Sequence, residues 1–135
     1  MSKETFDINQ KAIIVRGDIE LDDQKKRLLF IVDTGTQETL ISEKAIRAMG
    51  YTLVDSIEDV PIRTINGSGT AYRYIIESIT ALGITRRNMK IMSHPMPIDA
   101  GVDGLLGLDF FENTRLTIDF KLAEIIVDSR YTLEN

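Results

Sequence analysis

The sequence predicts an all-β protein, a small barrel or a sandwich, with one short helix. Short runs rich in apolar and β-branched residues recur along the chain, and turn-forming Asp, Asn and Gly residues separate them. Only one segment carries the start and stop signals of a helix. The strands are expected, in order, at residues 12–19, 28–32, 39–41, 60–65, 70–80, 87–92, 116–120 and 125–127.

Turn and cap residues place the individual elements. Asp22-Asp23-Gln24, between the first two runs, predicts a hairpin turn. Ser42 is expected to cap the helix, because its hydroxyl accepts a backbone hydrogen bond, and Glu43 favours the first turn. Gly50 is expected to end that helix. Asn66-Gly67-Ser68-Gly69 predicts the tip of a longer hairpin, because Asn and Gly tolerate positive φ.

Length and composition exclude several classes of function. The 135 residues predict one domain, residues 1–135, with its core at about 10–128. The net charge of -5 argues against nucleic acid as the main partner. There is no cysteine, which excludes thiol catalysis and disulfides. The single histidine, His94, has no second histidine or cysteine to join it, so neither a metal nor another cofactor is expected.

The chain also lacks the marks of a membrane or secreted protein. No apolar run reaches the length of a membrane span, so no membrane partner is expected. The N-terminus has no apolar segment of the kind found in secretory signals. We therefore expect a cytoplasmic location.

One apolar run ends abruptly in a carboxylate, a hydroxyl and a glycine, at Phe30-Ile31-Val32-Asp33-Thr34-Gly35-Thr36. A carboxylate buried at a strand end is costly unless it is hydrogen-bonded, paired or used in chemistry. Gly35 lets the backbone turn sharply or approach another backbone closely. The alternative is a turn aspartate that hydrogen-bonds its own backbone. The apolar run before it, and a second element at Gly104-Leu105-Leu106-Gly107, favour the chemical interpretation.

These elements together resemble the retropepsin-like aspartic proteases, from about residue 10 to residue 128. The resemblance implies a closed β-barrel in which Asp-Thr-Gly forms the catalytic loop. The hairpin would be a flap that closes over a bound peptide. Bacterial single-domain members and the protease-like domain of ubiquitin-shuttle proteins are most similar in residues 107–120. The site residues so implied are catalytic Asp33, the loop-supporting Thr34, Gly35, Thr36, Leu105, Leu106 and Gly107, and the flap or substrate-binding Ile65, Asn66, Gly67, Ser68 and Gly69.

The sequence departs from the retroviral pattern at two positions. Retroviral members pair an Asp, four residues after the catalytic Asp, with an Arg just after the apolar-apolar-glycine element. Gln37 and Leu108 stand at these positions here. Both partners are absent together, so no buried charge is left unpaired. This difference favours another way of supporting a dimer over loss of activity.

A single aspartate is insufficient for the chemistry that the resemblance implies. One ionised carboxylate accepts a proton from water but has no proton to donate to the peptide carbonyl, whereas two carboxyls sharing one proton do both. The chain has one Asp-Thr-Gly, and neither Asp103 nor Asp109 precedes a hydroxyl-glycine pair. We therefore expect a homodimer in which Asp33 of a second copy completes the pair. The resemblance gives Thr34 a hydrogen bond across the two-fold axis, and the alternative is a turn hydroxyl.

The sequence thus predicts an aspartic endopeptidase that binds an extended peptide between flap and catalytic loop. The second hypothesis is a proteolytically inactive module of the same fold that binds peptides or assembles a partner. The third is an unrelated β-barrel binding module. A dimer that cleaves peptides would favour the first hypothesis. A dimer that binds peptides without cleaving them would favour the second, and a monomer with an exposed Asp33 would favour the third.

Overall fold

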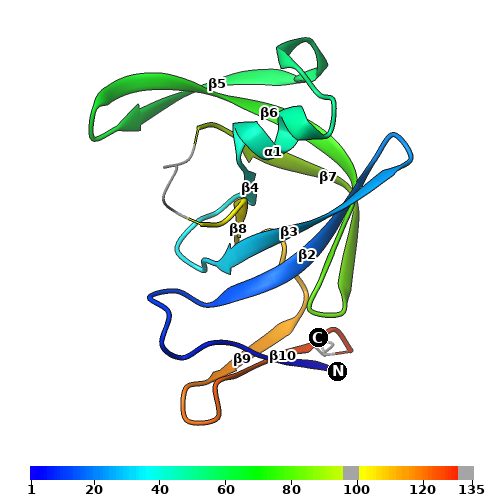
Figure 1. Cartoon of the computed structure of the whole chain (residues 1–135), viewed down its shortest axis with the longest axis vertical. Helices are drawn as coiled ribbons and strands as arrows, with labels where there is room; N and C mark the ends of the chain where they lie inside the picture. Colours follow the sequence, from blue (N-terminus) through cyan, green and yellow to red (C-terminus); the bar gives the residue numbers. More distant parts are fainter. Residues whose placement is uncertain (96–100, 131–135) are drawn as a thin grey trace, which may run out of the picture.

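The computed structural model describes residues 1–95 and 101–130. It is built mostly of strands, with one short α-helix and one turn of 3₁₀-helix (Figure 1). The elements are β1 (Ser2–Thr5), β2 (Ile14–Leu21), β3 (Gln24–Val32), β4 (Leu40–Ile41), α1 (Glu43–Ala48), η1 (Leu53–Asp55), β5 (Glu58–Thr64), β6 (Gly67–Ala81), β7 (Ile84–Ser93), β8 (Gly104–Leu106), β9 (Arg115–Asp119) and β10 (Glu124–Asp128).

A closed barrel forms the body of the molecule. Its strands follow the order β2-β3-β8-β4-β7-β6, and a pairing between β2 and β6 closes the ring. Because β6 is long, it takes part both in the barrel and in the hairpin with β5. Its last residues, from Ser78 to Ala81, pair with both β2 and β7, whereas its first half pairs with β5. The predicted barrel is confirmed, and the sandwich alternative is excluded.

The local signals in the sequence define the first hairpin and the helix. Asp22 and Asp23 adopt φ of 49° and 65°, which matches the twist of a two-residue hairpin between β2 and β3. The hydroxyl of Ser42 accepts a hydrogen bond from the Ala45 amide at 3.1 Å and caps α1. Gly50 follows the helix at φ 91°. The hairpin turn and the helix cap are therefore confirmed.

The barrel is filled by large side chains from every part of the ring. Phe30, Phe110 and Leu106 are fully buried in it. Gly17 is required beside Phe30, because an added Cβ would lie 2.8 Å from the Phe30 ring. At roughly 1.5–3 kcal/mol for each large apolar side chain buried, this core is the main source of stability.

A second, three-stranded sheet lies below the barrel in Figure 1, in the order β1-β10-β9. Sequence analysis did not predict β1, which pairs antiparallel with β10 near the other end of the chain. Phe6, just after β1, is buried and meets Phe120 edge-on at 6.3 Å between ring centroids. Within residues 1–95 and 101–130, no helix is long and apolar enough to cross a membrane.

Candidate active site

Asp33 is held at the end of β3 by its own backbone and by one of its carboxylate oxygens. Its amide donates to the Leu106 carbonyl at 3.0 Å, which extends the pairing of β3 with β8 by one residue. The Thr36 amide donates to the Asp33 carbonyl, and the Gly35 amide donates to Oδ1 at 3.0 Å. The side chain is half-buried, and Oδ2 accepts no hydrogen bond from the described part of the chain. The loop therefore fixes the carboxylate while leaving one oxygen open.

The two other aspartates near this loop are occupied by structural hydrogen bonds. Asp103 Oδ2 accepts from the Leu29 amide at 2.9 Å, and the Asp103 amide donates to the Leu29 carbonyl. Asp109 accepts from the Thr39 amide through both oxygens, and from the Thr39 hydroxyl at 2.7 Å. Asp109 thus uses both oxygens and Asp103 uses Oδ2 within the chain, whereas, among the described residues, the Asp33 carboxylate is bonded only to the Gly35 amide of its own turn.

The segment after β8 packs directly against the Asp33 loop. An added Cβ on Gly107 would lie 2.9 Å from the Thr36 carbonyl oxygen and 2.9 Å from the backbone of Glu38, so no larger residue fits. The Leu108 amide donates to the Thr36 carbonyl, and the Asp109 amide donates to the Gln37 carbonyl. Gln37 and Leu108 stand where retroviral members have their ion pair. Here backbone hydrogen bonds of these two residues join the loop to the segment after β8.

The buried Thr39 hydroxyl connects the loop to the segment 107–109. It donates to Asp109 and accepts a hydrogen bond from the Gly107 amide at 3.1 Å. Sequence analysis did not identify this pair as part of the site. One local signal was available, because Asp109 stands between Leu108 and Phe110, and a carboxylate among apolar residues must find hydrogen-bond donors.

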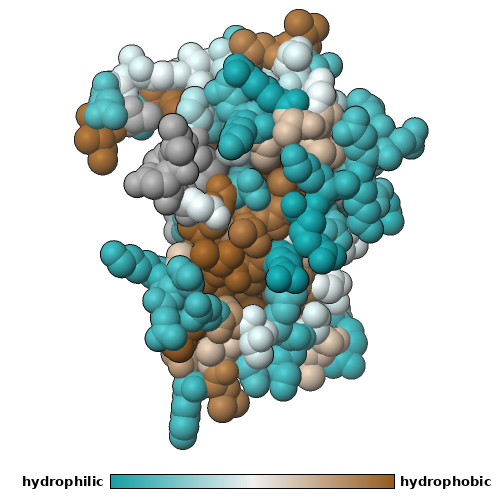
Figure 2. Space-filling model, in the orientation of Figure 1, coloured by the Kyte–Doolittle hydropathy of each residue, from teal (hydrophilic) through white to brown (hydrophobic). Residues whose placement is uncertain are grey.

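An apolar row crosses the sheet beside Asp33. Ile14, Ile31, Leu105, Leu40 and Met92 stand opposite one another on β2, β3, β8, β4 and β7. Ile31 and Leu105 point away from the core, because Phe30 and Leu106, the residues next to them, are fully buried and point into it. Figure 2 shows the resulting apolar area over β3 and β8. An extended chain lying here would meet apolar side chains next to the carboxylate.

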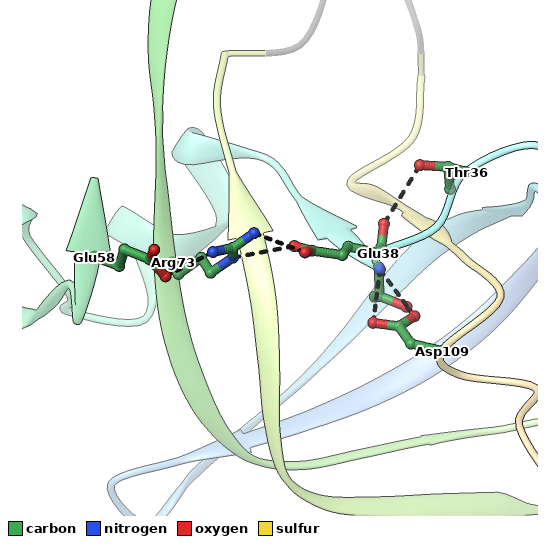
Figure 3. A network of polar contacts seen from close by, with 6 residues as sticks. Thr36, Glu38, Glu58, Arg73 and Asp109 are labelled. Atoms are coloured by element: carbon green, nitrogen blue, oxygen red, sulfur yellow. Dashed lines mark hydrogen bonds and ion pairs between the residues drawn. The ribbon is translucent and has the colours of Figure 1, made fainter. Parts of the chain in front are cut away.

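The same row ends in charged residues on the hairpin of β5 and β6. Arg73 on β6 stands opposite Met92, and Glu58 on β5 stands opposite Arg73. Arg73 donates to both oxygens of Glu38, at 2.7 and 3.2 Å, and to Glu58 at 2.6 Å (Figure 3). The hydrogen bond to Glu38, and to a lesser extent the one to Glu58, raises the pKa of the Arg73 guanidinium above its ordinary value.

The hairpin of β5 and β6 differs from the expected flap at its tip. Residues 65 and 66 form the turn, and Ile65 is fully exposed. Gly67 adopts φ 117°, as a glycine at such a turn is expected to do. Ser68 and Gly69 were expected at the tip, but they lie in β6, paired with Arg63 and Ile62. The turn is tighter than predicted because strand pairing continues up to Thr64 and Gly67.

Comparison with known proteins identifies the family. Residues 18–113 match the family model described as "gag-polyprotein putative aspartyl protease". The chain belongs to this family. Its fold is similar to that of a retropepsin-like aspartic protease from Rickettsia conorii, with a TM-score of 0.69 and 19% sequence identity over 93% of this chain and 90% of that chain. A search of curated proteins gives no match.

The aspartyl protease fold brings most of the expected site residues together. Asp33 and the loop residues Thr34, Gly35 and Thr36 lie beside Leu105–Gly107, and the Thr34 side chain is exposed. The five expected flap residues lie apart from them, in the hairpin of β5 and β6. Within the described residues, no group of three His, Cys, Asp or Glu side chains is placed to hold a metal ion. The catalytic and substrate-binding roles of these residues stay predictions.

Proposed function

We propose that this chain is an aspartic endopeptidase whose active site forms when Asp33 of two copies meet across a two-fold axis. The observation that carries the proposal is the place of Asp33 at the end of β3, in a loop that packs against Gly107. Asp103 and Asp109 each bridge to a distant segment, at Leu29 and Thr39, whereas in the described part of the chain the Asp33 carboxylate is bonded only within its own turn and lies at the edge of an apolar surface. A single domain spanning residues 1–135 is part of this proposal.

The chemistry follows from two carboxyls that share one proton. The ionised carboxyl takes a proton from water, and the water oxygen attacks the peptide carbonyl carbon. The protonated carboxyl gives its proton to the carbonyl oxygen, so a neutral tetrahedral diol forms. When this diol collapses, the first carboxyl gives the proton that it took from water to the leaving nitrogen, the C–N bond breaks, and a diol hydroxyl returns its proton to the second carboxylate. The Gly35 amide on Oδ1 keeps the Asp33 carboxylate oriented for these transfers.

The substrate that fits this surface is an extended peptide with apolar side chains next to the scissile bond. Ile31 and Leu105 offer half-exposed apolar side chains on the sheet that carries Asp33. The hairpin of β5 and β6 would cover the peptide and add backbone hydrogen bonds to it. Hydrolysis is expected to be fastest at roughly pH 4–6, because in such a pair the charge of one carboxylate raises the pKa of the other.

The direct test replaces Asp33 by Asn and measures hydrolysis of a quenched fluorescent peptide library. The change preserves the size of the side chain and its acceptor for the Gly35 amide, so folding should persist. Activity is expected to fall about a thousandfold or more, because general acid–base catalysis is lost. Asp103→Asn is the matched control, since an amide oxygen can still accept from Leu29, and it should retain activity. Equal activity of parent and Asp33→Asn would overturn the assignment.

Mixing the two proteins tests the dimer. A tenfold excess of Asp33→Asn chains should suppress the parent far beyond dilution, once subunits have exchanged, because mixed pairs retain one ionisable carboxyl. Activity should also fall on dilution below the dimer dissociation constant. An obligate interface of this kind is expected to bury more than about 2,000 Å². Activity per parent chain that stays constant at every ratio, with exchange verified by mass, would contradict the two-fold site.

The second candidate is an inactive peptide-binding module, and one observation favours it. The bond from the Gly35 amide to Asp33 Oδ1 is also what a purely structural turn aspartate makes. A parent protein that dimerises and binds peptides from the library, but never cuts them, would identify this alternative.

A further inference from the structure

One guanidinium joins three segments that are distant in the sequence. Arg73 lies in β6, Glu58 lies in β5, and Glu38 lies in the loop between Asp33 and β4. Glu58 and Arg73 form the pair of the β5–β6 ladder farthest from its tip. Figure 3 shows Arg73 between the two carboxylates, with one on each side. The contact therefore links the base of the flap hairpin to the catalytic loop.

The geometry is that of a clamp rather than of a loose surface pair. Arg73 meets Glu38 through two nitrogens and both carboxylate oxygens, and meets Glu58 through its third nitrogen. Its side chain is 23% exposed, against 36% for Glu38 and 54% for Glu58. Two-pronged pairs of this kind define an orientation as well as a distance. Lysine, with one nitrogen, could not hold both carboxylates in this way.

Glu38 itself has little freedom to move with respect to Asp33. Its carbonyl accepts from the Thr36 hydroxyl at 3.5 Å, and its backbone packs against Gly107. The next residue, Thr39, is fully buried and bonded to Asp109. A group attached to the Glu38 carboxylate is thus attached to the part of the loop that is held most firmly.

We infer that Arg73 is a positioning residue that sets the flap hairpin over the Asp33 loop, chiefly through Glu38. The inference rests on the proposed function, because it assumes that the hairpin closes over substrate. Releasing the clamp leaves the chemical groups in place and lowers the fraction of molecules whose hairpin is placed for binding. A smaller competent fraction raises the apparent dissociation constant in proportion.

The test compares substitutions of the two carboxylates. If Arg73 served only to join β5 to β6 within the hairpin, Glu58→Gln would change KM and hydrogen exchange more than Glu38→Gln would. If it positions the hairpin on the loop, Glu38→Gln should resemble Arg73→Met, and Glu58→Gln should change little. For Arg73→Met and Glu38→Gln, KM on the peptide library should rise about tenfold while kcat stays within about threefold. Arg73→Lys should recover part of the loss.

Hydrogen exchange supplies a readout that needs no activity. In Arg73→Met, amides of residues 62–69 should exchange about tenfold faster while β2 and β3 stay protected. Arg27→Met is the matched control, because Arg27 and Asp18 form a cross-strand ion pair on β2 and β3, away from the flap. It should leave the exchange of residues 62–69 unchanged.

Exchange that rises equally in all strands, or that responds to Glu58→Gln and not to Glu38→Gln, would overturn the inference. A parent protein that shows no hydrolysis would refute the proposed function, and the exchange measurements would still decide the role of Arg73.

Discussion

Glycine serves opposite purposes in the Asp33 loop and in the hairpin of β5 and β6. Gly107 lies against the loop with no room for a side chain, since its Cβ would clash with the backbone of Thr36 and Glu38. Gly67 stands in open space, where an added Cβ would meet nothing within 4 Å, and it adopts a positive φ. The first glycine permits a close approach of two backbones, and the second permits a tight turn.

The two regions also differ in burial. Thr39 and Gly107 belong to a buried network, and every group of that network has a partner. Ile65 at the hairpin tip is fully exposed, and Gly67 and Gly69 are exposed as well. Segments with few buried contacts open at low free energy, whereas buried networks open only with the whole fold. We therefore expect changes in the buried network of Thr39 and Gly107 to affect stability, and changes at the hairpin tip to affect function.

The largest effect on stability is expected from Gly107→Ala. The new methyl group would lie 2.9 Å from backbone atoms that are held by their own hydrogen bonds, so the loop itself must shift. We expect a loss of about 3 kcal/mol or more in the free energy of unfolding, measured by denaturant titration. Gly69→Ala, whose Cβ would lie 3.9 Å from Ile62, is the matched control and should cost much less. Similar losses for both would remove the distinction between the regions.

A somewhat smaller loss is expected from Thr39→Val. This substitution keeps the shape of the side chain and removes the hydroxyl that donates to Asp109 and accepts from Gly107. Leaving the buried Gly107 amide without an acceptor should cost about 1–3 kcal/mol. Thr80→Val removes an exposed hydroxyl that faces Thr85 and should stay within about 0.5 kcal/mol of the parent. Chemical denaturation of both variants makes the comparison.

The sequence predicts features whose causes are local. The turn at Asp22 and Asp23 and the Ser42 cap each depend on a few adjacent residues, and both are confirmed. The apolar run ending at Asp33 predicts a strand that delivers a carboxylate into a turn, which is how β3 ends.

Features made by distant residues escape this kind of prediction. Thr39 and Asp109 are 70 positions apart, and Arg73 and Glu38 are 35 apart. The strand β1 has no apolar pattern of its own and depends on its pairing with β10. Asn66 and Gly67 carry a strong turn signal, yet the turn lies one residue earlier, because pairing between β5 and β6 sets the register.

At the tip of the β5–β6 hairpin, Gly67→Val should reduce activity more than stability. A β-branched residue at φ 117° is strained by about 1–3 kcal/mol, and the exposed turn would change its shape to relieve this strain. We expect kcat/KM to fall about tenfold and the melting temperature to change by only a few degrees. Gly69→Val is the matched control, because Gly69 has no positive φ and lies in β6. If Gly67→Val and Gly69→Val lower the melting temperature by the same amount and kcat/KM by the same factor, the hairpin contributes to stability rather than to substrate binding.

The smallest effect is expected outside both regions, at the pair of Asp18 and Arg27 on β2 and β3. The hydrogen bond from Arg27 holds the pKa of Asp18 below its ordinary value, against a smaller opposing effect of burial. A carboxylate whose pKa is lower in the folded state contributes stability above its unfolded pKa of about 3.9 and loses that contribution as the pH falls through its folded pKa. The difference in melting temperature between parent and Arg27→Met should therefore be small at about pH 7, since the pair is exposed, and should shrink further as the pH falls through the folded-state pKa of Asp18. The melting temperature of Arg73→Met, measured in the same way, gives the comparison. If Arg27→Met lowers the melting temperature at neutral pH as much as Arg73→Met does, any cross-strand ion pair stabilises this barrel. The β5–β6 hairpin would then have no special connection to the Asp33 loop.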